Sequence, residues 1–148
     1  MKVKSQKSKV KSREDYYLVL DPGASDGTLG FFVLNKQGGI VINYKFRRDS
    51  KSIEKLLVAI ERKLMGVRLT LRDVKGVAVV EGGESFSLVR GAHAVTNSLG
   101  WSLGIPTMRV SKSLSHKVIE SALGALKRLK KFHLLIPEYT KEPNITLK

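Results

Sequence analysis

The stretch from Gly76 to Pro106 constrains the fold of this chain most, because it reads as a strand, a turn and a helix in direct succession. The strand, Val77 to Val80, is apolar throughout, as expected when both faces of a strand are covered. Ser85 is placed to cap the helix that follows. The glycines and the proline that punctuate the stretch are Gly82, Gly83, Gly104 and Pro106. The sequence therefore predicts a helix N-terminus at the end of a buried strand, where α/β proteins commonly bind anions, ligands or partners.

Three apolar segments before this unit predict a set of strands. They cover residues 16–21, 29–35 and 39–47, and they are rich in aromatic and β-branched residues. Lys36, Gln37 and Gly38 separate the last two segments, a spacing typical of an antiparallel hairpin. In residues 39–47, one set of alternate side chains is apolar throughout and the other becomes polar toward the end of the segment. We therefore expect the apolar face of this strand to be buried.

Apolar residues at helical spacing predict three helices. They run from Ser52 to Gly66, from about Ser85 to Leu103 and from about Val118 to Phe132, and a short strand, Thr107 to Val110, separates the last two. The order is β-β-β-α-β-α-β-α, and right-handed crossovers would place all five strands in one mixed sheet with flanking helices. This is the ribonuclease H-like α/β topology, which is also the repeating half of the actin and hexokinase superfamily. It hosts nucleases, kinases and inactive scaffolds, so the fold alone leaves the function open.

The composition favours one soluble, cytoplasmic domain. A chain of 148 residues with 42% hydrophobic content is long enough to bury a core of its own. It contains no cysteine, and no apolar run approaches the about 20 residues that a membrane-spanning helix needs. We therefore expect no disulfide, no thiolate metal site and no contact with a membrane.

The formal net charge of +14 is concentrated at two places. Residues 1–14 are expected to form a disordered basic tail, and a second basic cluster covers residues 127–131. Such a tail favours contact with the phosphates of RNA or DNA, and a purely solubilising role is the alternative. The tail residues predicted to bind nucleic acid are Lys2, Lys4, Lys7, Lys9, Lys11 and Arg13.

Two carboxylates at strand ends indicate a metal-dependent, structure-specific nuclease as the alternative function. Asp21 ends the first strand, where nucleases of this fold hold their first metal ligand, and residues 20–23 resemble the opening of Holliday-junction resolvases. Glu81 ends the fourth strand and is the candidate second ligand. Two-metal chemistry needs several converging carboxylates, and only Glu120 lies in a later helix that can return to this place. The interpretation that Asp21 and Glu81 are ordinary turn residues is therefore favoured.

No other metal or cofactor site is expected. His93, His116 and His133 lack metal-ligand spacing. The turn before the second helix lacks a Walker-type lysine and carries Glu81 and Glu84, so it is a poor place for a nucleotide.

The segment from Ser85 to Arg90, with the sequence SFSLVR, resembles a motif of the TsaB (YeaZ) family. In that family the pattern G-P-G-S-F-T-G-L-R is followed by L-G-I-P, at the same ungapped distance at which Leu103 to Pro106 stands here. The preceding helix and strand are also similar, as is the ending IPEYTKEPNIT. The resemblance covers about residues 16–115 and this ending.

The resemblance implies a non-catalytic scaffold or activator in the bacterial synthesis of threonylcarbamoyladenosine on tRNA. Members of the family pair with a TsaD-like catalytic subunit through helices of their N-terminal domains, and a TsaE-like ATPase joins them. The chain itself would then be no enzyme and would need no cofactor. Family members usually have a second domain, whereas here one domain (residues 15–134) precedes an extended tail (residues 135–148), which implies an N-terminal-domain-only form.

The first two helices are the predicted partner surface. The second helix has the small residues Gly91, Ala92, Ala94 and Gly100, which allow close approach by another helix or a sheet. The predicted contacts with the TsaD-like partner are Leu56, Ile60, Phe86, Arg90 and His93. A homodimer is the alternative, since a surface that pairs with a related fold can also pair with itself.

Overall fold

The computed structural model describes most of the chain between residues 14 and 136. The described residues are 14–22, 28–47, 49, 51–81, 86–110 and 116–136. The strands are β1 (Tyr16–Asp21), β2 (Thr28–Leu34), β3 (Ile40–Arg47), β4 (Val74–Val80) and β5 (Thr107–Val110). The helices are α2 (Ser52–Gly66), a short 3-10 helix η2 (Leu71–Asp73), α3 (Phe86–Leu103) and α4 (His116–Arg128). The predicted succession of strands and helices is thus confirmed.

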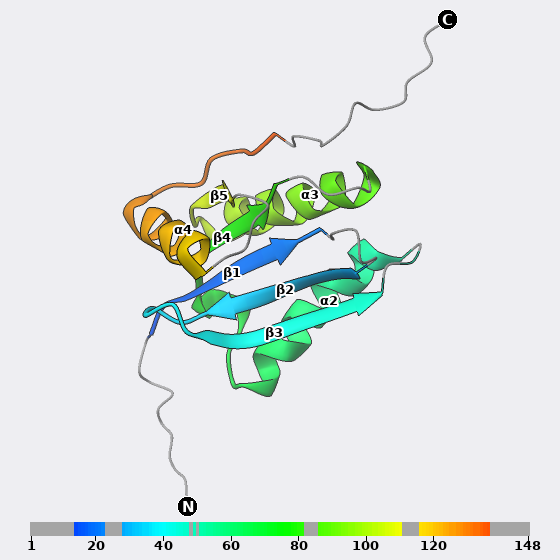
Figure 1. Ribbon diagram of the computed structural model, residues 1–148, viewed down its shortest axis with the longest axis horizontal. Helices are drawn as coiled ribbons and strands as arrows, with labels where there is room; N and C mark the ends of the chain where they lie inside the picture. Colours follow the sequence, from blue (N-terminus) through cyan, green and yellow to red (C-terminus); the bar gives the residue numbers. More distant parts are fainter. Residues whose placement is uncertain are drawn as a thin grey trace, which may run out of the picture.

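The five strands form one mixed sheet in the order β3-β2-β1-β4-β5. The first three make an antiparallel meander, whereas β4 is parallel to β1 and β5 is parallel to β4. Leu18 in the middle of β1 lies opposite Val33 of β2 and Val77 of β4. Figure 1 shows the strands side by side, with β3 at one side of the sheet and β5 at the other. This is the ribonuclease H-like arrangement that the sequence predicts.

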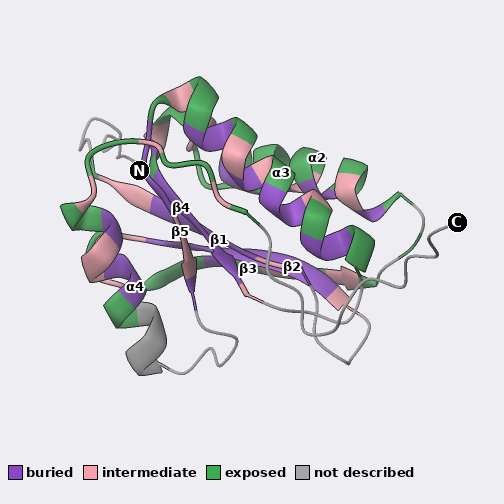
Figure 2. Ribbon diagram, turned by 90° about the horizontal axis from the view of Figure 1, so that it is seen from above, coloured by how far each residue is buried: buried purple, intermediate pink, exposed green. Residues whose placement is uncertain are grey.

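Helices cover both faces of the sheet (Figure 2). Because side chains alternate along β1, Leu18 and Leu20 point into the core that α2 and α3 cover, and Tyr17 and Val19 point into the core that α4 covers. The fully buried residues of α2 are Leu56, Ile60 and Leu64. No helix in the described part of the chain has both the length and the apolar character required to cross a membrane.

Two glycines let α3 approach its neighbours closely. A Cβ added to Gly91 would lie 2.4 Å from Cγ1 of Ile53 on α2. A Cβ added to Gly100 would lie 2.4 Å from Cγ2 of Thr107 on β5. The close approach that the small residues of this helix allow is therefore used within the chain itself, by one helix and by the sheet.

An extended segment after α4, residues 132–136, fastens onto the fold, and we call it the C-terminal strap. It runs along the β5 side of the molecule, past α3 (Figure 1). The side chain of Asn97 donates to the carbonyl of Leu135 at 3.0 Å and accepts from its amide at 2.9 Å. Arg109 of β5 donates through Nη1 to the carbonyl of Ile136 at 2.9 Å. Side chains of α3 and β5 therefore satisfy the backbone of the strap.

Burial of Tyr17 is expected to make the fold sensitive to alkaline pH. Burial, together with the charge of Asp15, raises the pKa of the Tyr17 hydroxyl above its ordinary value of 10.0. The unfolded chain then loses this proton before the folded chain does, so stability falls as the pH rises through about 10. We expect Tyr17→Phe to flatten this fall, measured as the free energy of unfolding in urea between about pH 9 and pH 11. An unchanged slope in the variant would contradict the assignment.

Candidate functional site

The parallel strands β1 and β4 bring two carboxylates to the same end of the sheet, where both strands finish. Leu20 lies opposite Val79, so Asp21 and Glu81 stand at the adjoining carboxyl ends of the two strands, and both are half-buried. Glu120, the predicted third carboxylate, is exposed on α4. Among the described residues, no group of three or more histidines, aspartates and glutamates is arranged to hold a metal ion. Only two carboxylates, Asp21 and Glu81, are found at the described carboxyl ends of these strands. Two-metal nuclease chemistry needs more than two.

The predicted anion or partner turn and the predicted nucleic-acid-binding tail lie outside the described residues. These are residues 82–85, with the capping residue Ser85, and Lys2, Lys4, Lys7, Lys9, Lys11 and Arg13. The second basic cluster is described and exposed at the end of α4: Lys127, Arg128, Lys130 and Lys131. Lys127 donates through Nζ to the carbonyl of Lys36 at 2.6 Å, so this cluster lies beside the β2–β3 hairpin.

Three of the five predicted partner contacts are buried within the protein. Leu56 and Ile60 have no exposed surface and pack in the core that α2 covers. His93 is 1% exposed, and its Nδ1 donates to the carbonyl of Val89 at 2.9 Å. The prediction that these three side chains meet a partner is therefore wrong, because the chain uses the inner face of each helix to cover its own sheet.

The outer face of α3 carries the other two candidates. Phe86 and Arg90 are exposed one helical turn apart, and Cζ of Arg90 lies 5.8 Å from the centroid of the Phe86 ring, within cation–π range. Trp101 lies on the same face and is 75% exposed. Trp101 is not among the contacts predicted from the sequence, although its helical position relative to Arg90 places it away from the buried Leu88 and Leu99.

The outer face of α2 adds two further exposed apolar side chains. Leu57 is 41% exposed and Met65 is 70% exposed. Since α2 and α3 pack against each other on one face of the sheet, their outer residues form one surface of the molecule (Figure 2). We call this surface the helix face and define it by Leu57, Met65, Phe86, Arg90 and Trp101.

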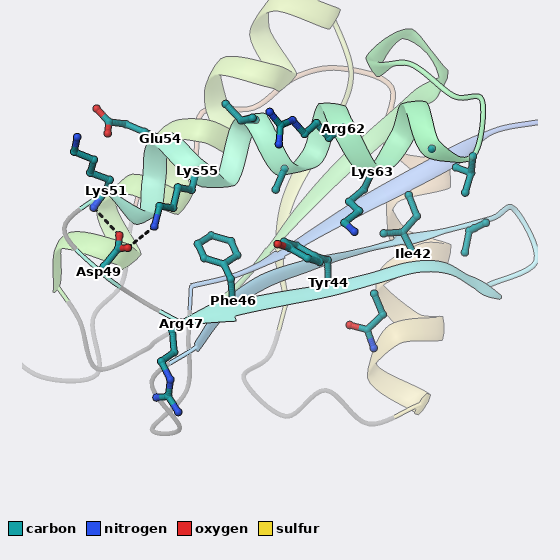
Figure 3. A pocket seen from close by; sticks show the side chains of 16 residues that line it. Ile42, Tyr44, Phe46, Arg47, Asp49, Lys51, Glu54, Lys55, Arg62 and Lys63 are labelled. Atoms are coloured by element: carbon teal, nitrogen blue, oxygen red, sulfur yellow. Dashed lines mark hydrogen bonds and ion pairs between the residues drawn. The ribbon is translucent and has the colours of Figure 1, made fainter.

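A groove lies between α2 and the edge strand β3 (Figure 3). Its volume is about 1080 Å³. The floor contains Tyr44 and Phe46, whose ring centroids are 5.9 Å apart, and Nζ of Lys63 lies 4.5 Å from the centroid of the Tyr44 ring. The sequence gives no direct signal for this groove, because it depends on how the side chains of α2 pack beside those of β3, the strand that precedes it.

One end of the groove is built around Asp49. Its carboxylate forms an ion pair with Lys55 and accepts a hydrogen bond from the backbone amide of Lys51 at 2.8 Å (Figure 3). The hydrogen bond from Lys55, and then that from Lys51, lower the pKa of this carboxyl. The backbone amide of Asp49 donates to Oγ of Ser52 at 2.7 Å, so the same residue also fixes the start of α2.

The sheet order and the helices on both faces define an α/β domain with the ribonuclease H-like topology that the sequence predicts. Among solved structures, the chain is similar to YeaZ from Pseudomonas aeruginosa, with 23% sequence identity and a TM-score of 0.57, over 66% of this chain and 44% of that one. It is similar to a second structure, an uncharacterized protein with similarity to peptidase YEAZ from Pseudomonas aeruginosa, with 23% identity and a TM-score of 0.58, over 66% of this chain and 43% of that one. No family model and no curated protein matches the sequence.

At this level of identity, the likeness to YeaZ establishes a common fold. The match spans less than half the length of either solved structure. What the whole of a YeaZ-like protein does is therefore a matter of proposal for this chain.

Proposed function

We propose that this chain is a non-catalytic subunit that binds and activates a TsaD-like catalytic subunit in the synthesis of threonylcarbamoyladenosine on tRNA. Two independent features support the proposal. The SFSLVR motif and the L-G-I-P spacing resemble the TsaB family, and the described fold is similar to YeaZ. The observation that carries the docking site is the helix face, because it exposes large apolar side chains on two adjacent helices.

The helix face has the composition of a partner surface. Contiguous exposed apolar patches on soluble proteins often mark interaction sites, and tryptophan and arginine are enriched among residues that dominate binding. Trp101 and Arg90 supply these two residue types, and the exposed Leu57 and Met65 extend the apolar area onto α2. Phe86 and Arg90 keep their predicted partner role, whereas Leu57, Met65 and Trp101 take the place of the buried candidates.

The proposal includes two further participants. A TsaE-like ATPase would join the pair, and tRNA phosphates would be contacted by the basic residues that precede Glu14. A homodimer formed through the helix face is the competing assembly, because the same surface would serve both.

We expect the purified chain to form a heterodimer with the TsaD-like protein of the same genome, and tRNA modification to depend on it. Trp101→Ala and Arg90→Glu should each weaken this complex at least about tenfold, the effect of losing about 1.4 kcal/mol at an interface residue. Light scattering gives the mass of the complex, titration calorimetry gives its affinity, and incorporation of labelled threonine into tRNA gives the activity.

Arg128→Glu is the matched control for Arg90→Glu. It makes the same change of charge at an exposed residue of α4, on the opposite face of the sheet, and should leave the affinity within about twofold. Equal losses in both variants would mean that bulk charge and not the helix face drives binding. Failure to form a complex, together with magnesium-dependent cleavage of branched DNA that Asp21→Asn abolishes, would overturn the proposal in favour of the nuclease.

A further inference from the structure

The groove between α2 and β3 borders an open edge of the sheet. β3 is the last strand on its side, and among the described residues it pairs only with β2. One row of its backbone N–H and C=O groups therefore has no strand partner in the described part of the chain. Such an edge is a template for pairing with another extended chain, unless charges or neighbouring elements block it.

The groove offers apolar contact along this edge. Tyr44 and Phe46 of β3 are half-buried on its floor. Val58 of α2 and Val67 just beyond that helix are 48% and 42% exposed in its wall, and Val41 is 39% exposed at the strand. A strand laid beside β3 would bury these side chains, which gives a physical gain from filling the groove.

The charged side chains of the groove are predominantly basic. Its lining includes five cations, Arg47, Lys51, Lys55, Arg62 and Lys63, against two carboxylates, Asp49 and Glu54. Asp49 is already engaged by Lys55 and by the amide of Lys51. In contrast, the side chains of Arg47 and Arg62 form no hydrogen bond or ion pair with another residue of the described part of the chain. Figure 3 shows Arg62 on α2 above the groove and Arg47 at the end of β3, pointing away from α2.

We propose that this groove binds an acidic, extended peptide segment of another protein, which adds to the sheet as a sixth strand beside β3. Backbone hydrogen bonds to β3 would supply affinity, and the cations on both sides of the strand would select carboxylate side chains. The eight residues of β3 give such a segment about 26 Å of edge to pair with. This inference is independent of the proposed function, because the groove lies on the β3 side of α2 and shares no residue with the helix face.

Charge also argues against a second copy of the chain as the occupant. Pairing of two β3 strands would bring Lys45, Arg47 and the groove cations of one copy next to those of the other. Like charges placed directly opposite each other destabilise paired strands. An acidic partner avoids this repulsion and neutralises the excess positive charge of the groove.

The test uses two synthetic probes on the full chain. Both are blocked, fluorescently labelled ten-residue peptides, one alternating valine with glutamate and the other alternating valine with lysine. Fluorescence anisotropy should show binding of the acidic peptide alone, and hydrogen exchange should show slower exchange of the amides of residues 40–47 when it is bound. Arg62→Glu should lower its affinity at least about tenfold, whereas Arg128→Glu, the same change of charge on the opposite face, should change it less than about twofold.

Three outcomes would overturn the proposal. Equal losses in Arg62→Glu and Arg128→Glu would mean that the peptide responds only to the net charge of the chain. Binding without protection of residues 40–47 would exclude strand addition. A single-stranded oligonucleotide that displaces the acidic peptide and protects the same amides would assign the groove to nucleic acid. Circular dichroism of Arg62→Glu checks that this exposed substitution leaves the fold intact, and Arg62→Gln gives a second, milder variant for the same measurement.

Discussion

Replacement of Ile60 by glutamate is expected to unfold the chain, whereas the same replacement at Leu57, one turn earlier on α2, should leave it folded. Ile60 has no exposed surface and packs in the core between α2 and the sheet. A carboxylate placed there either loses its hydration or drags water into the core. The cost should exceed about 4 kcal/mol, a large part of the about 5–15 kcal/mol that stabilises a typical domain.

The measurement is thermal and urea unfolding of both variants beside the unchanged chain. For a domain of this size, a loss of about 4 kcal/mol lowers the Tm by about 10 °C or more, provided that the variant folds at all. Leu57→Glu, at a position that is 41% exposed, should cost less than about 1 kcal/mol. If both variants were equally stable, Ile60 would not be a core residue and its prediction as a partner contact would have to be reinstated.

A methyl group added at Gly30 is expected to cause the second large loss of stability. A Cβ at this position of β2 would lie 2.3 Å from the backbone oxygen of Tyr44 and 3.1 Å from Cα of Lys45. The closest of the atoms in the way belongs to the backbone of β3, so a change of rotamer cannot relieve the clash. The two strands must separate locally, and Gly30→Ala should cost at least about 3 kcal/mol, at the upper end of what overpacking usually costs.

Gly66→Ala provides the control for this prediction. A Cβ at Gly66, the last residue of α2, would meet no atom within 4 Å. Alanine is the better helix former, so this variant should be as stable as the unchanged chain or more stable by up to about 1 kcal/mol. Urea unfolding compares the two variants, and hydrogen exchange of residues 40–47 shows whether β3 loosens in Gly30→Ala. Comparable stability of the two variants would mean that β2 and β3 do not approach each other as closely as described.

The sequence predicted the elements of the fold because each carries a local signal. The alternation in β3, the glycine hairpin before it and the apolar run of β4 are short-range patterns, and the observed bounds agree with them within a few residues. The order of the elements then left few topologies for the sheet. The strand before α3 is longer than predicted, since it begins at Val74, because Val74 and Gly76 are buried beside β1 as well.

The site was harder to predict because it depends on which side of each helix faces the sheet. The apolar stripe of α2 was visible in the sequence. Leu56 and Ile60 were predicted to contact a partner, whereas in the folded chain they pack against its own sheet. On α3, the outward position of Phe86 and Arg90 follows once Leu88 is known to be buried. The groove could not be predicted from the pattern of either element alone, because it is formed by side chains of α2 and β3 that only the folded chain brings together.

The two sides of the sheet differ in a way that limits how copies of the chain can assemble. The C-terminal strap occupies the β5 side, where Asn97 and Arg109 hold its backbone, while β3 on the other side is open in the described part of the chain. Pairing of two such sheets through β3 would consume both of these open edges, so any further growth of the sheet would have to start from the β5 side, beside the strap.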